Sequence, residues 1–479
     1  MKKKLILLFS CLFLFTSIFA FPASAAGDEG FTIDFETNCN AIFMKNLDTG
    51  TVVYTKNADE RIEPASTTKI LTYIVVSENV EDLDGTTVTL TQELKDSLEG
   101  TGSSIANIMV GETMSIYEAL NCLMVPSGND AAVILADYVG GRKNQETGNP
   151  EKLSNIDRFV QMMNDKAAEL GCTGTHFANP DGLHDENHYT TARDMGIMAE
   201  YAMDLPRFMD IVSQTYHIVP ATNMQEERRL DTTNLMMLPG YPDYYYQYVT
   251  GIKTGWHDQA GDCIVTTAKA EGYAYLCVAM GSPHVAGQDP VPDNGAMIDS
   301  KALYRWAFRT FTLKSIVDME KPLAEVNLNL AWEKDTLLLV PEKDVTALLP
   351  NDVDLNSIVV SEVEKPESVN APITKGEILG KATLSYANHE LATINLVASE
   401  DVQRSDLLYY WEGAKNIISS PWFLGICGLF VLLFIIYLII ATIYNRRDRR
   451  KRKVKKYRKF ETRLWFSLFS AERRSKRIV

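Results

Sequence analysis

The sequence predicts an α/β (α+β) protein with a larger domain of helices and strands, a small β-rich domain and a C-terminal transmembrane helix. Helical and strand-like patterns are mixed up to about residue 312, and only strand patterns follow as far as residue 400. A charge-free apolar segment then covers residues 422–444. We therefore expect domains at residues 34–312 and 313–400, a stalk at residues 401–421 and a membrane helix behind it.

The first residues have the pattern of a cleaved secretory signal. Lys2, Lys3 and Lys4 precede an apolar stretch, and Ala23 and Ala25 provide a small-residue cleavage site. We expect residues 1–26 to be removed from the mature protein. An uncleaved N-terminal membrane anchor is the alternative, which the cleavage site disfavours.

Hydrophobic periodicity predicts the elements of the larger domain. Two glycines, Gly140 and Gly141, are expected to end one helix, with residues 141–155 as a polar insertion after it and the tyrosine-rich residues 241–248 as a loop. The expected elements are a hairpin at residues 41–45 and 52–54, helices near 66–76, 115–124, 131–138, 156–170, 191–203 and 297–308, and strands at 251–255, 262–267 and 275–281.

Alternating residues predict the strands of the small domain. Val326, Leu328, Leu330 and Trp332 are expected on one face of the first strand. Further strands are expected at residues 337–340, 357–363, 378–384 and 391–397.

The apolar segment at residues 422–444 is long enough to cross a bilayer, because 23 helical residues span roughly 34 Å. Residues 445–479 contain 16 Lys and Arg against 3 Asp and Glu, and such a basic end remains cytoplasmic. We expect a single-pass protein of the cell membrane with extracellular domains. Its basic cytoplasmic tail is expected to lie near anionic lipid headgroups.

The net charge of −15 conceals a division along the chain. Between the signal and the tail, 28 basic residues face 59 acidic ones, which disfavours nucleic acid as a partner. The seven cysteines form neither a disulfide framework nor a metal motif. His184 and His188 are four residues apart but lie in a polar loop, so we expect no metal and no cofactor.

Three short motifs carry the candidate chemistry. Ser66 and Lys69 lie three residues apart at a helix start, where the lysine amine reaches the serine hydroxyl. A desolvated lysine has a lowered pKa and acts as a base, so Ser66 is the candidate nucleophile and Lys69 its general base. Each motif alone is weak evidence, because S-x-x-K arises by chance in many chains.

The second motif, S-G-N, lies on a tight loop between two helices. Ser127 is a candidate proton relay, and Asn129 supplies an amide that orients the substrate or Lys69.

The third motif, K-T-G, lies on a strand. Lys253 and Thr254 offer a cation and a hydroxyl to a terminal carboxylate, and Gly255 permits close approach of the substrate. The backbone N–H groups of Ser66 and Trp256 are the candidate oxyanion donors.

S-x-x-K, S-x-N and K-T-G in this order are the serine acyl-transferase set. Over residues 34–400 the chain resembles the low-molecular-mass penicillin-binding proteins, the D-alanyl-D-alanine carboxypeptidases of serine peptidase family S11. Further similarity lies in Asn179-Pro180 with Gly182-Leu183, in Thr190-Thr191-Ala192, and in Ala371-Pro372 with Gly380.

The resemblance implies an antiparallel sheet with a helical cluster and a β-rich domain. It implies an enzyme that removes the terminal D-alanine from peptidoglycan stem pentapeptides through an acyl-enzyme on Ser66, and so regulates cross-linking of the cell wall. Lys253 would hold the terminal carboxylate, and penicillin and other β-lactams would acylate the enzyme. The sequence departs from the family at His257, where a threonine is common, and in its apparent membrane span.

Three alternatives remain. A D,D-endopeptidase that cleaves cross-links has the same motifs. A β-lactamase needs an added glutamate, and Glu151 only superficially fits that role. A non-catalytic peptidoglycan-binding scaffold is disfavoured by the intact motifs.

Overall fold

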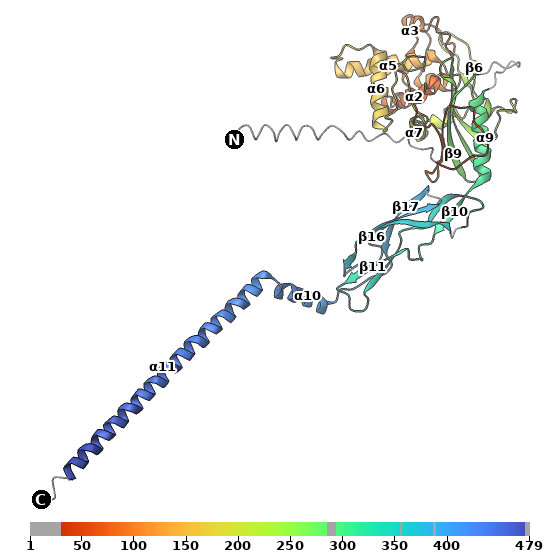
Figure 1. Ribbon diagram of the computed structural model, residues 1–479. Helices are drawn as coiled ribbons and strands as arrows, with labels where there is room; N and C mark the ends of the chain where they lie inside the picture. The colour runs from red at the N-terminus through yellow and green to blue at the C-terminus, as the bar shows by residue number, and fades with distance from the viewer. Residues whose placement is uncertain (1–29, 285–293, 355–356, 387–388, 475–479) are drawn as a thin grey trace, which may run out of the picture. The chain divides into compact units, whose positions relative to one another are not determined.

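The computed structural model describes residues 30–284, 294–354, 357–386 and 389–474 and divides into two units (Figure 1). The first unit comprises the described residues of Met1–Asp318, Asp344–Ser361 and Thr383–Thr393, and the second those of Met319–Lys343, Glu362–Ala382 and Ile394–Val479. The predicted signal, residues 1–26, lies outside the described residues.

The first unit is built on a five-stranded antiparallel sheet in the order β2-β1-β9-β8-β7. This order places β7 at one edge of the sheet, so that among the described strands only β8 pairs with it in this sheet. The predicted hairpin and the three later strands are confirmed. The bounds are β1 Ala41–Asn46, β2 Val52–Lys56, β7 Val249–His257, β8 Gly261–Ala270 and β9 Tyr273–Ser282.

The sheet separates two hydrophobic cores because successive side chains of a strand point to opposite faces. On β1, Ala41 and Phe43 pack into the core that contains helix α2, Lys69–Asn79. Ile42 and Met44 pack into the other core, with helix α9, Gly295–Thr310. The two faces of the sheet are therefore covered by different parts of the chain.

Most of the remaining helices lie on the α2 side of the sheet and begin at a capping side chain. Ser115, Ser154 and Thr191 each accept a hydrogen bond from a backbone N–H three residues later, which satisfies a free donor of the first turn. The helices are α3 Gln92–Asp96, α4 Ile116–Met124, α5 Asn129–Thr147, α6 Asn155–Glu169, α7 Ala192–Met203 and α8 Phe208–Val212, with two short strand pairs, β3 Thr87–Thr89 with β4 Thr113–Ser115, and β5 Tyr216–Val219 with β6 Arg228–Asp231.

The predicted end of a helix at Gly140 and Gly141 is wrong, because α5 continues to Thr147. The glycines serve packing instead. A Cβ atom on Gly140 would lie 1.9 Å from the backbone oxygen of Asn155, where α6 begins. Residues 141–147 are therefore helix rather than insertion.

Gly140→Ala is expected to destabilise the first unit by about 2 kcal/mol, because overpacking against a fixed backbone costs more than alanine gains in helix propensity. Gly141→Ala is the matched control, since its Cβ would meet the side chain of Asn155, which can move. Thermal unfolding followed by circular dichroism measures both. Equal melting temperatures for the two variants would contradict this packing role.

The second sheet has six strands in the order β14-β16-β17-β12-β11-β15. The predicted strands are confirmed, but the first is shorter than expected: it ends at Asn329, Leu330 has a φ of 61°, and Trp332 is 70% exposed. The strands are β11 Ala324–Asn329, β12 Thr336–Pro341, β14 Val359–Glu364, β15 Ser368–Asn370, β16 Ile378–Tyr386 and β17 His389–Ala398, and a separate pair is formed by β10 Phe311–Val317 and β13 Val345–Pro350.

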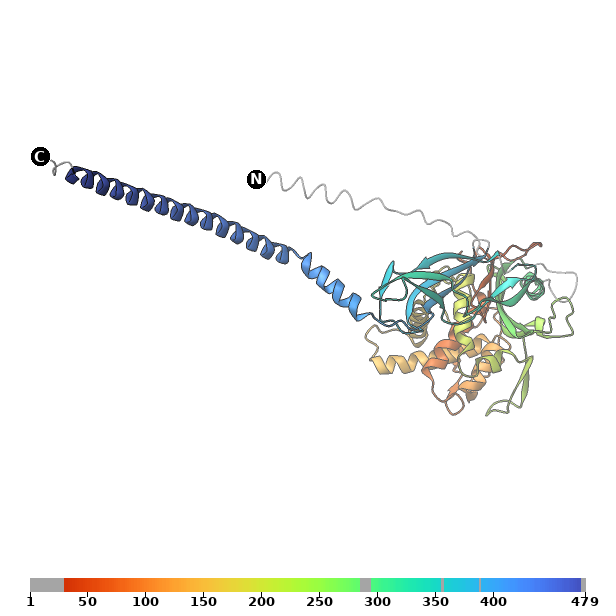
Figure 2. The same cartoon turned by 90° about the horizontal axis from the view of Figure 1, so that it is seen from below.

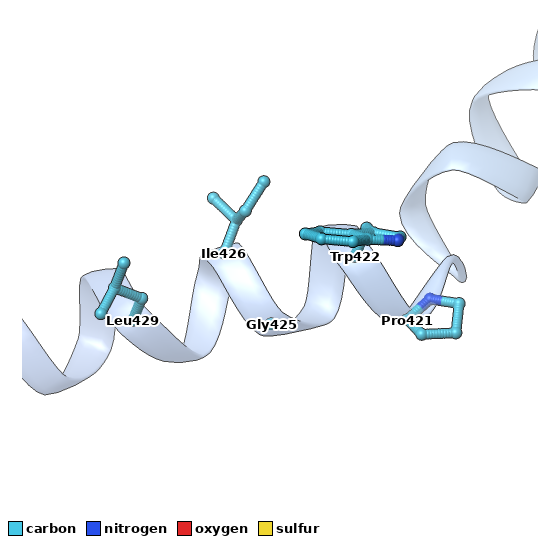
Figure 3. Close-up of a pocket in the computed structure, with 5 residues that line it drawn as sticks. All are labelled: Pro421, Trp422, Gly425, Ile426 and Leu429. Atoms are coloured by element: carbon cyan, nitrogen blue, oxygen red, sulfur yellow. The ribbon is translucent and has the colours of Figure 1, made fainter.

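Two helices end the described chain. Helix α10, Asp406–Ile418, occupies most of the segment expected to be a stalk, and α11, Pro421–Arg474, follows it (Figures 1 and 2). Within the described residues, α11 is the one helix long and apolar enough to cross a membrane. Figure 3 shows its first turns, where Pro421, Trp422, Gly425, Ile426 and Leu429 line an apolar depression without acid–base groups.

Candidate active site

The candidate nucleophile lies on a tight turn immediately before α2. Ser66 belongs to a 3-10 turn, Ala65–Thr68, and Lys69 begins the α-helix. The hydroxyl of Thr67 donates to the carbonyl of Pro64 at 2.6 Å and that of Thr68 to the carbonyl of Ala65 at 2.8 Å. These bonds hold the backbone on either side of Ser66.

Lys69 is fully buried, and its Nζ makes three hydrogen bonds. It donates to Ser66 Oγ at 2.8 Å, to Asn129 Oδ1 at 2.7 Å and to the backbone oxygen of Asp181 at 2.8 Å. Burial lowers the pKa of Lys69 to about 8. One amine thus joins the helix start, the second motif and the turn at Asp181.

This arrangement determines what a neutral Lys69 does. A neutral amine has two N–H donors and one lone pair, whereas the ammonium has three donors. The oxygens of Asn129 and Asp181 can only accept, so they retain the two N–H donors. The lone pair is left for Ser66, whose hydroxyl is the only one of the three partners that can donate a proton.

The carbonyl of Asp181 was not predicted as part of the site. Asp181 lies in a turn that begins at Asn179, and the Oδ1 atom of Asn179 accepts a hydrogen bond from the N–H of Gly182 at 2.8 Å. Gly182 has a φ of 91°, and a Cβ there would lie 1.9 Å from the carbonyl oxygen of Ala65. The glycine lets this turn press against the nucleophile segment. The N-P-x-G-L sequence was the available signal.

The loop of the second motif is fixed from its own backbone. Ser127 is buried with a φ of 67°, and the N–H of Asn129 donates to the carbonyl of Ser104 at 2.8 Å. The carboxylate of Asp130 accepts from the N–H groups of Ala106 at 2.9 Å and Ile108 at 3.0 Å. Ser127 and Gly128 lie on the predicted loop, but Asn129 is the first residue of α5 and reaches Lys69 from a helix start that is tied to residues 104–108.

The third motif lies on the edge strand β7, beside Ser66. A Cβ on Gly255 would lie 2.8 Å from the backbone nitrogen of Ser66, so only glycine permits this approach. Lys253 is buried, and its Nζ donates to the carbonyl of Thr254 at 2.8 Å. Burial and the charge of Lys69 hold the pKa of Lys253 well below its ordinary value.

Two further side chains of β7 face the opposite side of the strand from Gly255. The hydroxyl of Thr254 lies 2.5 Å from that of Thr233, and Trp256 is half exposed against the ring of His284, with ring centroids 4.7 Å apart. Thr233 was not predicted. Trp256 is the residue after Gly255, so its backbone N–H lies next to the point where β7 approaches the backbone of Ser66.

The two histidines of the loop at residues 184–188 have different environments. His188 is buried, with Nε2 2.8 Å from the hydroxyl of Thr68 and Nδ1 accepting from the N–H of Ala178. His184 is exposed and contacts Glu63. In the described residues, no group of three or more His, Cys, Asp or Glu side chains is placed to hold a metal ion.

Comparison with known proteins identifies the family. The family model of D-alanyl-D-alanine carboxypeptidase, Peptidase S11, matches residues 32–284, more than half of the chain. The chain belongs to this family. The model of the penicillin-binding protein 5 C-terminal domain matches residues 311–404.

Individual relatives of this carboxypeptidase agree. DacF of Bacillus subtilis, a D-alanyl-D-alanine carboxypeptidase, is 28% identical over 86% of this chain and 97% of its own length. The D-alanyl-D-alanine carboxypeptidase of Streptomyces sp. K15 is 30% identical over 52% of this chain and 82% of its own. The chain is therefore a D-alanyl-D-alanine carboxypeptidase of the serine type.

A solved structure supports the fold alone. Penicillin-binding protein 5 of Haemophilus influenzae superposes with a TM-score of 0.59 at 23% identity and covers 78% of this chain and 100% of its own. The predicted fold class, a mixed α/β domain followed by a β-rich domain, is confirmed.

Proposed function

We propose that Ser66 is the nucleophile that removes the terminal D-alanine from peptidoglycan stem pentapeptides. Ser66 Oγ attacks the carbonyl carbon of the penultimate D-alanine while its proton passes to neutral Lys69. The peptide C–N bond then breaks, and the leaving amine takes a proton as free D-alanine. Water attacks the acyl-enzyme in the second half and releases the shortened peptide.

The observation that supports this proposal is the set of three hydrogen bonds made by Lys69 Nζ. Two acceptor-only oxygens fix the amine, so that its lone pair is available to Ser66 alone. A pKa of about 8 makes a useful fraction of the amine neutral near neutral pH.

We propose roles for the other motif residues as well. Ser127 returns the proton to the leaving amine, and Asn129 orients Lys69. Lys253 and Thr254 bind the terminal carboxylate of the substrate. The N–H groups of Ser66 and Trp256 stabilise the oxyanion beside the free edge of β7, where an extended peptide can add as a further strand.

The test uses the full-length chain in detergent with three substrates: a stem pentapeptide ending in D-Ala-D-Ala, a cross-linked dimer and a chromogenic β-lactam. Release of D-alanine from the pentapeptide supports the proposal. Cleavage of the dimer alone would indicate an endopeptidase, and rapid turnover of the β-lactam a β-lactamase. Stable β-lactam inhibition without D-alanine release would contradict the proposed reaction.

Gly255→Ala is expected to lower the rate of D-alanine release about 100-fold, because its Cβ would displace the backbone at Ser66 and a misplacement of about 1 Å costs that much. Gly240→Ala is the control, since a Cβ there meets no atom within 4 Å. Steady-state kinetics on both variants makes the comparison. Wild-type activity in Gly255→Ala would exclude close approach of β7 to the nucleophile.

For the remainder of the chain we propose domains at residues 34–312 and 313–400, a cleaved signal at residues 1–26 and a single membrane span at 422–444. The carboxypeptidase would then face the outside, with the basic tail near anionic lipid. The apolar, charge-free start of α11 and the positive charge behind it support this topology. Protease treatment of intact cells should digest the ectodomain and leave the tail; digestion of the tail first would contradict the orientation.

A further inference from the structure

A carboxylate and two imidazoles meet beside the candidate active site. Nδ1 of His184 lies 2.7 Å from Glu63 Oε2, and Nε2 of His257 lies 3.5 Å from the same oxygen. The two rings are 6.0 Å apart between centroids. One oxygen atom of Glu63 therefore faces both histidines.

The tautomer of His257 follows from its second contact. Its Nδ1 accepts a hydrogen bond from the backbone N–H of Ala260 at 3.1 Å. In the neutral imidazole one nitrogen accepts and the other carries the proton. The proton of His257 is thus on Nε2, the nitrogen that lies 3.5 Å from Glu63 Oε2.

Each member of this cluster lies two or three residues from a group that touches the catalytic centre. Glu63 is three residues before Ser66, and His257 is two residues after Gly255, where a Cβ would lie 2.8 Å from the backbone nitrogen of Ser66. His184 is three residues after Asp181, whose carbonyl accepts from Lys69. The cluster joins three chain segments that are distant from one another in sequence.

We propose that Glu63, His184 and His257 form a clamp that positions the nucleophile segment, the Asp181 turn and the end of β7 for acyl transfer. The inference rests on the proposed function, because it concerns the geometry of that site. These are positioning residues: they act through Ser66, Lys69 and the backbone of β7 and do not contact the reacting atoms.

The clamp depends on pH through His184. The hydrogen bond to Glu63 raises the pKa of His184, while burial lowers that of His257. A group whose folded-state pKa is raised contributes at low pH, and its contribution is lost as pH rises through that pKa. Below the raised pKa of His184, the charged pair between His184 and Glu63 therefore tightens the clamp. Above that pKa His184 loses its charge and the clamp weakens.

Further titratable groups surround the clamp. Asp185 and Glu186 lie on the loop of His184, and Asp258 follows His257. His188 is close enough to the clamp for His184 and His257 to lower its pKa, and His176 acts on His188 in the same direction. The nearby acidic groups favour the charged form of His184, in the same direction as Glu63.

The test measures D-alanine release by the full-length chain between pH 6 and pH 9 for wild type, His184→Gln, Glu63→Gln and the control His176→Gln. His176 is exposed, and its Nδ1 contacts the carbonyl of Asn187 instead of Glu63. The ratio of wild-type to His184→Gln rates is expected to be about two to five at pH 6, the range of an exposed ion pair, and to approach one at pH 9. Glu63→Gln is expected to lower the rate of D-alanine release more than His184→Gln does at every pH. His176→Gln is expected to leave the rate unchanged.

An NMR titration of the imidazoles provides a readout that does not depend on activity. The pKa of His184 should fall in Glu63→Gln and stay unchanged in His176→Gln. Ratios of one at all pH values, or a pH-independent loss that follows a lower melting temperature, would overturn the clamp. A wild-type chain that releases no D-alanine would instead refute the proposed function, and the titration would still test the contact.

Discussion

Ser66→Ala is expected to reduce release of D-alanine from a stem pentapeptide by a factor of about 10⁴ or more, because no acyl-enzyme can form without the hydroxyl. The fold should be unaffected, since the change removes one partly buried oxygen atom whose bonds are to Lys69 and to the carbonyl of Asp181. An amino-acid oxidase assay for free D-alanine measures the loss.

The control for this prediction is Ser213→Ala, a change at the exposed serine that directly follows α8 as its C-cap. It should retain wild-type activity. Substantial turnover by Ser66→Ala, at a rate close to that of Ser213→Ala, would mean that another residue supplies the nucleophile.

Lys69→Arg is expected to lower the acylation rate by roughly 10²–10⁴, the usual contribution of a general base, because a guanidinium retains its proton at all working pH values. In the wild type, acylation should rise about tenfold per pH unit below pH 8 and level off above it, since the reactive amine of Lys69 has a pKa of about 8. Stopped-flow acylation by a β-lactam gives both results.

Two controls accompany this experiment. Lys143→Arg changes a half-exposed lysine on α5 and should leave the rate and its pH dependence unaltered. Lys69→Met removes the amine without the bulk of arginine, and its acylation rate should fall as much as that of Lys69→Arg. A wild-type rate that is flat between pH 6 and pH 9 would contradict the role of Lys69 as base.

Side-chain chemistry at fixed spacing was the part of the site that the sequence could reveal. The distance of three residues between Ser66 and Lys69 was enough to predict their contact, because residues three apart share a helix face. Asn129 begins α5, far from Lys69 in sequence, and its contact with Lys69 was expected only from the order of the motifs.

Backbone groups were harder to predict. The acceptor on Asp181 is a peptide carbonyl, which every residue has, so no residue type marks it. A backbone group also misled the prediction for α5. Gly140 is typical of a helix end in sequence, but it is required here because the backbone of Asn155 approaches it closely. The joint contact of Glu63 with His184 and His257 depends on three segments that only the fold brings together.

Peptide mapping by mass spectrometry, after the full-length chain is labelled with penicillin, would identify the nucleophile. We expect one covalent adduct, with the mass of the intact β-lactam, on the peptide that contains Ser66, and its loss in Ser66→Ala. An adduct on another residue, or no adduct in a folded chain, would contradict the assignment of Ser66 as the nucleophile.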